Sequence, residues 1–107
     1  MRTLLIVESR DVWEHRGPGQ MADLAAGMVK AGVPTTIFIT ENAVFGGRRG
    51  TDGPFKAALA GGVTFMADRF ALDERAIGAA DLKSGIAATD VGVIVDHLAA
   101  GACIMWR

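Results

Sequence analysis

The chain has 107 residues and a mass of 11.2 kDa, which suits one domain and is too short for two. Half of its residues are hydrophobic and only 21% are charged, and this excludes intrinsic disorder. The mean hydropathy of +0.30 indicates more apolar side chains than so small a domain can bury by itself. We therefore expect self-association.

The charge balance is nearly neutral, with 11 basic and 12 acidic groups and a net charge of −1. A nucleic-acid binder would show a basic excess, so we expect no such partner. No apolar run reaches membrane-spanning length, and the residues after Met1 lack a signal-peptide pattern. The lone Cys103 can form neither an internal disulfide nor a cysteine zinc cluster. We expect a cytoplasmic protein with no membrane partner, metal or cofactor.

The first elements alternate between strand and helix patterns. Residues 3–7 predict a strand buried on both faces, and a polar stretch over 9–17 follows. Pro18 suits the first turn of a helix that ends near Gly32. Its amphipathic stripe has the i, i+3, i+4, i+7 spacing and consists of Met21, Leu24, Ala25 and Met28.

The middle of the chain repeats this alternation. Residues 33–40 predict a second strand, and 41–45 a short helical turn. Glycines over 46–53 predict a flexible loop. Residues 54–61 then predict a helix, and 62–67 a third strand.

The last part predicts two more strands. Residues 68–77 favour a loop leading into a short helix, and the ambiguous stretch 79–88 contains a very short strand near 85–87. Thr89 is the expected N-cap of a helix whose stripe is Val91, Ile94, Val95 and Leu98, and 102–106 form the final strand. Alternating strands and helices predict an α/β fold: a single three-layer α/β/α domain over residues 1–107, with a mostly parallel sheet of about five strands.

Polar side chains follow the predicted strands where ligands bind in open α/β sheets, outside the carboxyl ends. We take six of them as candidate ligand-binding residues: Ser9, Asp11, His15, Asn42, Asp68 and Arg69. The alternative is that they only cap strands and helices. We assign no catalytic residue.

Two other functions remain open. His15 with Asp11 or Asp68 could supply acid–base groups for a small-molecule enzyme. Residues 17–22 match the G-x-G-x-x-A dinucleotide fingerprint, but about nine residues separate them from the strand, and helix capping by Pro and Gly explains them more simply. With Arg48 and Arg49 they would form a nucleotide or phosphate site.

The remaining notable side chains are apolar. Cys103 opens an apolar strand after a helix C-terminus, so we expect it to be a buried core residue, on the amino side of the sheet. We expect four aromatic residues at subunit contacts: Trp13, Phe45, Phe70 and Trp106.

Three stretches together resemble the DsrE/DsrF-like family of small α/β proteins of sulfur relays. They are the opening strand, polar loop and helix leading into residues 31–38; residues 62–77; and the tail, where an Ala-rich link precedes a helix and a last strand. The resemblance covers nearly the whole chain, and the order and spacing of the pieces carry it. It implies a homo-oligomer, a trimer or hexamer, or assembly with related DsrE-like subunits.

The departure from the family concerns its persulfide-forming cysteine. Relatives carry this cysteine in the loop after the third strand, where this chain has Asp68 and Ala71, or after the first strand, where residues 9–20 contain none. Persulfide transfer requires a thiolate. The resemblance therefore does not extend sulfurtransferase activity to this chain, and implies a non-catalytic, regulatory or small-ligand-binding member.

Overall fold

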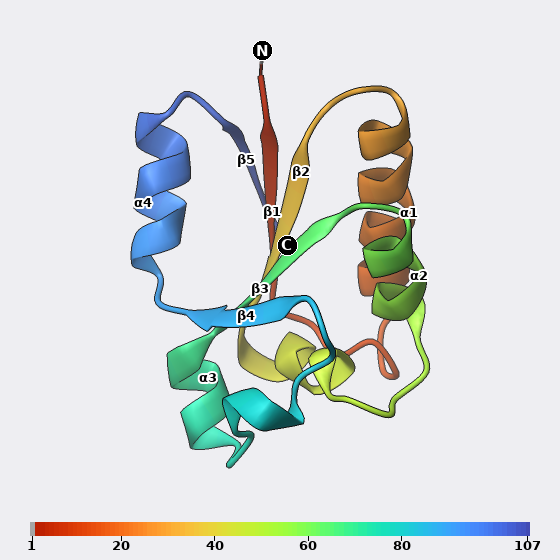
Figure 1. Cartoon of the computed structure of the whole chain (residues 1–107), viewed down its shortest axis with the longest axis vertical. Helices are drawn as coiled ribbons and strands as arrows, with labels where there is room; N and C mark the ends of the chain where they lie inside the picture. The colour runs from red at the N-terminus through yellow and green to blue at the C-terminus, as the bar shows by residue number, and fades with distance from the viewer. Residues whose placement is uncertain (1) are drawn as a thin grey trace.

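A computed structural model describes residues 2–107 and contains one five-stranded sheet of order β4-β3-β2-β1-β5 (Figure 1). All four strand pairings are parallel. The strands are β1 (Leu4–Glu8), β2 (Thr35–Ile39), β3 (Thr64–Asp68), β4 (Ile86–Thr89) and β5 (Cys103–Trp106). The helices are α1 (Gly17–Lys30), α2 (Pro54–Ala60), α3 (Arg69–Glu74) and α4 (Gly92–Ala99), with the 3-10 helices η1 (Glu41–Gly47) and η2 (Ala79–Asp81).

The two faces of the sheet are covered unequally. Helices α1 and α2 cover one face and α4 the other (Figure 1). The larger core lies under α1 and α2, where Phe55 and Phe65 pack with ring centroids 5.1 Å apart. The smaller core, on the α4 side, is built on Leu5, Val7 and Phe38. The predicted three-layer α/β/α architecture and parallel sheet are confirmed.

The strand order reverses once, beside β1. Strands β1 to β4 are laid down in one direction, and α4 then leads the chain back across the sheet to β5, which pairs with the free side of β1. Such a reversal opens a crevice between the carboxyl ends of the two strands. Here residue 107 bridges it, because the Arg107 carbonyl accepts hydrogen bonds from Ser9 N (3.1 Å) and Ser9 Oγ (2.8 Å). The crevice is therefore partly filled by the chain itself.

Two local predictions need correction. Thr89 is not a helix N-cap but the last residue of β4, paired with Asp68. The Asp90 carboxylate instead accepts from Gly92 N at the start of α4, at 2.8 Å. The expected flexible loop over 46–53 begins inside η1, where Gly46 and Gly47 are buried. The spacing of glycines in the sequence does not reveal the close packing that requires them.

Gly46 is a position where packing excludes a side chain. A Cβ there would lie 2.8 Å from Phe55 Cε2 and 3.0 Å from Val12 Cγ1. We expect Gly46→Ala to lower the free energy of unfolding by about 1–3 kcal/mol, the usual cost of overpacking a core. Gly27→Ala is the matched control, because nothing lies within 4 Å of a Cβ in this exposed part of α1. It should raise stability by about 0.5–1 kcal/mol. Urea unfolding measures both, and equal stability of the two variants would contradict this account.

Candidate functional site

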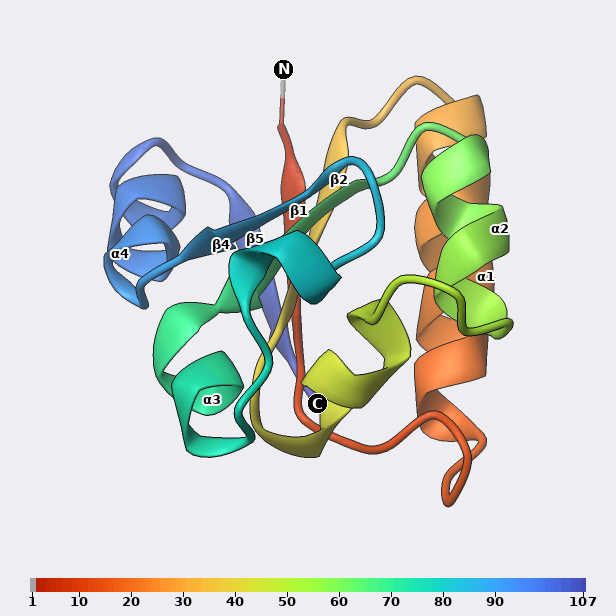
Figure 2. The ribbon, with the colours of Figure 1, turned by 60° about the horizontal axis from the view of Figure 1, so that its bottom comes forward.

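The carboxyl edge of the sheet gathers the ends of β1, β2 and β3, as predicted for parallel strands. Figure 2 brings this edge forward, with η1, α3 and η2 in front of the sheet. Four predicted residues, Ser9, Asn42, Asp68 and Arg69, lie at or just beyond these strand ends. Asp11 and His15 lie in the segment between β1 and α1.

Asp68 is the most buried of the predicted residues, with 5% of its surface exposed. Its Oδ2 accepts from Thr40 Oγ1 at 2.7 Å, and its Oδ1 accepts from Phe70 N at 3.2 Å. The first bond joins the ends of β2 and β3, and the second caps α3. Both oxygens are thus engaged in holding the carboxyl edge together.

Asn42 and Arg69 also make structural contacts. Asn42 Oδ1 accepts from Nη2 and Nε of Arg75, at 2.9 and 3.2 Å. Arg69 Nη2 donates to the Ala88 carbonyl at 3.1 Å, which ties α3 to β4. Asn42 therefore positions a second arginine that no sequence pattern had indicated.

Asp11 and His15 are close in sequence but are not joined through their side chains. Asp11 Oδ1 accepts from Trp13 N at 2.7 Å, and His15 N donates to the Asp11 carbonyl at 3.2 Å. The exposed His15 side chain makes no hydrogen bond to any residue in 2–107, and it lines a broad surface hollow of about 580 Å³ with Trp13 and Gln20. Within the described residues, the His15 imidazole forms no hydrogen bond with the carboxylate of either Asp11 or Asp68.

Glu8 is a buried carboxylate at the end of β1 and is not one of the six candidate residues. Only 1% of the residue is exposed, and its Oε2 accepts from the backbone N–H groups of Ser9 and Arg10, each at 3.0 Å. Its Oε1 has no hydrogen-bond partner within the described residues. Its place after an apolar strand groups it with the polar residues at the carboxyl edge, but the sequence pattern does not indicate that it is buried.

The crevice beside β1 contains a small hollow of about 160 Å³ on the α4 side. Its polar lining is Ser9, Thr40 and Glu41, and its apolar lining includes Phe38 and Trp106. Glu41 has a φ of 48°, in the left-handed region. This conformation is unfavourable for a residue that has a Cβ atom, and it often occurs at functional sites. The volume is nevertheless below the roughly 300 Å³ at which small-molecule pockets usually begin.

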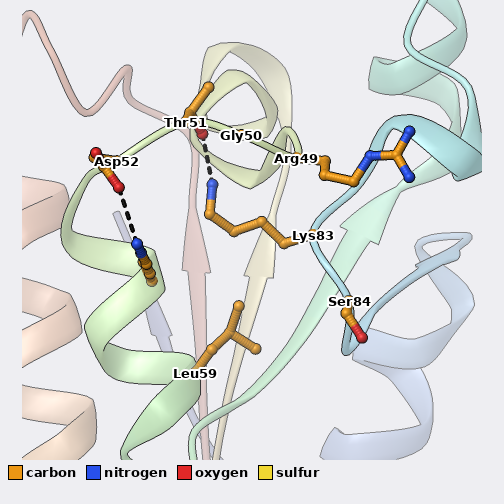
Figure 3. Close-up of a pocket in the computed structure, with 8 residues that line it drawn as sticks. Arg49, Gly50, Thr51, Asp52, Leu59, Lys83 and Ser84 are labelled. Carbon is orange, nitrogen blue, oxygen red and sulfur yellow. Dashed lines mark hydrogen bonds and ion pairs between the residues drawn. The ribbon is translucent and has the colours of Figure 1, made fainter.

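A larger hollow of about 460 Å³ lies between the 49–52 segment, α2 and the residues before β4 (Figure 3). At its wall Lys83 Nζ donates to Thr51 Oγ1 (2.5 Å) and to the carbonyls of Arg48 (2.7 Å) and Gly46 (3.1 Å). Burial lowers the pKa of Lys83 below 10.5, and the nearby Asp52 carboxylate partly offsets this effect. Lys83 therefore anchors the segment that the glycines had suggested to be flexible. It lies in the stretch whose sequence pattern was ambiguous.

The predicted phosphate-binding residues do not line one hollow. Gly19 borders the broad hollow that contains His15. Arg48 and Arg49 instead line a hollow of about 360 Å³ beside η1. Glycines at a helix start and a basic pair some thirty residues later need not meet in three dimensions, and these lie on different hollows.

Cys103 is not buried, which corrects the expectation drawn from its apolar neighbours. It is exposed at the amino end of β5, and Arg2 Nη1 lies 3.1 Å from its Sγ. Because β5 is an edge strand with a thin covering layer, an apolar sequence there does not ensure burial. Its place on the amino side of the sheet is as predicted.

No group of three His, Cys, Asp or Glu residues within 2–107 is arranged to hold a metal ion. No helix in the same residues is long and apolar enough to cross a bilayer.

Removing the Asp68 carboxylate should loosen the carboxyl edge. Asp68→Ala leaves Thr40 without its partner and α3 without its cap, so we expect a loss of about 2 kcal/mol in the free energy of unfolding. Asp68→Asn retains an oxygen for Phe70 N and should lose less than half as much. Urea unfolding compares the two, and an Asp68→Ala protein as stable as the native chain would refute this role.

Comparison with known proteins shows similarity in structure alone. No family model matches the chain, and no curated protein matches it in sequence. Three solved structures superpose on nearly its whole length. YchN from E. coli has a TM-score of 0.88 and 15% identity, covering 100% of both chains. MTH1491 from Methanobacterium thermoautotrophicum, a protein of unknown function, has a TM-score of 0.78 and 21% identity, covering 99% of this chain and 98% of that one.

The third structure is BT1422 from Bacteroides thetaiotaomicron, a conserved protein of unknown function. It has a TM-score of 0.79 and 17% identity, and covers 98% of this chain and 94% of its own. At these identities the similarity shows a common fold. The chain thus shares its fold with YchN and with two proteins of unknown function.

Proposed function

We propose that this chain is a DsrE-like protein that works as a homo-oligomer of three or six subunits and binds a small ligand without carrying a persulfide. A band of exposed apolar side chains on α4 is the observation that carries this proposal. Val91, Val95 and Leu98 are 58%, 65% and 63% exposed. Their spacing of four and three residues puts them on one helix face.

The face of α4 next to this band contacts the sheet. Val93 and Ile94 pack on the smaller core, whereas the three residues of the band remain largely exposed. Phe70 and Trp106 add further apolar surface, at 69% and 66% exposed. Apolar patches of this kind favour burial against another protein surface.

A second copy of the chain is the occupant that we propose for this band. The net charge of −1 produces little repulsion between copies. An 11.2 kDa chain also buries only about 65% of its unfolded surface alone, so association adds the burial that the small α4-side core lacks. Related DsrE-like subunits are the other partner to which the resemblance extends.

The proposed lack of persulfide transfer is supported by Asp68. The resemblance puts the carrier cysteine of relatives in the loop where this chain has Asp68 and Ala71, and here the Asp68 carboxylate is buried and hydrogen-bonded to Thr40 and Phe70. Cys103 begins β5 at the amino edge, at the opposite end of the sheet. We also propose a cytoplasmic location, which suits a chain that has one cysteine and hence no disulfide framework.

Assembly through α4 is tested by light scattering. We expect the native protein to have three or six times the chain mass, and Val95→Asp to have the mass of one chain, because a buried unpaired carboxylate opposes association. Ala57→Asp puts the same charge on an exposed position of α2, on the other layer, and should keep the native mass. Circular dichroism establishes that each variant is folded. A native protein with the mass of one chain, or a Val95→Asp assembly of native mass, would contradict the proposal.

Persulfide chemistry is tested by intact mass after incubation with a persulfide donor. We expect no added sulfur atom, about 32 Da, that passes from the native protein to an acceptor thiol. Cys103→Ser is the control, since it removes the only thiol of the chain. Onward transfer by the native protein that is lost in Cys103→Ser would identify a carrier and overturn this part of the proposal.

A further inference from the structure

A hollow of about 360 Å³ lies at the carboxyl edge of the sheet, between η1, the end of α3 and η2. It is more than twice the volume of the crevice beside β1 and reaches the size range of small-molecule pockets. Three of its lining residues are arginines. The lining consists of Phe45, Arg48, Arg49, Arg75, Ala76, Ile77 and Asp81.

Two of the arginines are held in place around an aromatic ring. The Cζ atoms of Arg48 and Arg75 lie 5.1 and 5.8 Å from the centroid of the Phe45 ring, within cation–π range. Arg48 Nε donates to the Phe45 carbonyl at 3.1 Å. Arg75 donates to Asn42 Oδ1 through two nitrogens and to the Ala71 carbonyl through Nη1. Guanidinium groups fixed in this way lose little entropy when they bind an anion.

The third arginine is held by its backbone and free in its side chain. Arg49 N donates to the Asp81 carbonyl at 2.6 Å. The Arg49 side chain makes no hydrogen bond within residues 2–107, and Figure 3 shows its guanidinium beside the segment that precedes β4. The two Nη atoms of Arg48 likewise have no hydrogen-bond partner in the described part of the chain. The hollow therefore offers charged N–H donors that the fold does not use.

The charges around the hollow do not cancel. Asp81 is the carboxylate among the lining residues, and its Oδ2 accepts from Gly78 N at 2.9 Å; Glu74 lies 3.6 Å from Arg75 Nη1. Three positive groups thus face two negative ones, in a chain whose total charge is −1. This local positive excess favours an anionic ligand.

We propose that this hollow binds a small molecule that carries a phosphate group, with its apolar part against Phe45 and Ala76. The inference rests on the ligand-binding role proposed above and names its ligand class. A phosphate monoester has a charge of about −1.5 to −2 and three acceptor oxygens, which suit three guanidinium groups better than the two oxygens of a carboxylate. The volume fits a monoester and is small for a dinucleotide.

Isothermal titration calorimetry with phenyl phosphate tests this site, because the probe joins a phosphate to an apolar ring. Inorganic phosphate and benzoate are the comparison probes, one lacking the ring and the other the phosphate. We expect saturable binding of phenyl phosphate, weaker binding of both others, and an affinity that falls as salt is added.

Arg49→Gln is the variant of choice, because it removes a charge without breaking a side-chain hydrogen bond within the described residues. It should weaken phenyl phosphate binding by about tenfold, at the lower end of what a charge-assisted hydrogen bond contributes. Lys30→Gln makes the same change of charge at the other end of the molecule, on the last residue of α1. That control should leave the affinity within about twofold of native, because screening removes distant charge effects.

Each outcome decides the inference. No saturable binding of phenyl phosphate by the native protein, or equal weakening by Arg49→Gln and Lys30→Gln, would overturn it. Binding of benzoate alone would overturn the phosphate assignment and leave the broader ligand-binding role intact. Arg49-dependent binding of phenyl phosphate by a protein with the mass of one chain would support this site while contradicting the proposed assembly.

Discussion

An all-parallel sheet has apolar side chains on both faces, and water must be excluded from both. In this chain α1 and α2 cover one face with a large core, whereas α4 alone covers the other with a core based on Leu5, Val7 and Phe38. Helix α4 has no fully buried residue, and its outer face is apolar. The unequal covering of the sheet is therefore the physical reason to propose a partner on the α4 side.

The same parallel arrangement brings all strand ends to one edge and concentrates polar groups there. Most of these groups are used by the fold. Asp68 joins β2 to β3 and caps α3, Arg69 ties α3 to β4, and Ser9 holds the carbonyl of Arg107. A polar residue at a strand end can therefore stabilise the edge of the sheet as readily as it can bind a ligand.

The basic segment after η1 shows how a surface loop becomes ordered. Lys83 donates to three oxygens of residues 46–51, and an isolated bridge pairs Arg48 with Leu82. These bonds hold the backbone of Arg48 and Arg49, so their guanidinium groups are presented from a fixed support. Preorganised charge of this kind is what an anion site requires, and it depends on contacts between segments more than thirty residues apart in the chain.

The sequence by itself determined the α/β class, the order of the elements and their approximate bounds, because strand and helix periodicities depend on neighbouring residues. It also placed Asn42 and Asp68 at the carboxyl edge, since parallel strands must end together. Burial and pairing were decided only by the tertiary structure. Cys103 is exposed because β5 lies at the edge of the sheet, and Arg75 meets Arg48 at Phe45 because α3 folds back beside η1. Both depend on contacts between distant segments, which local sequence patterns do not encode.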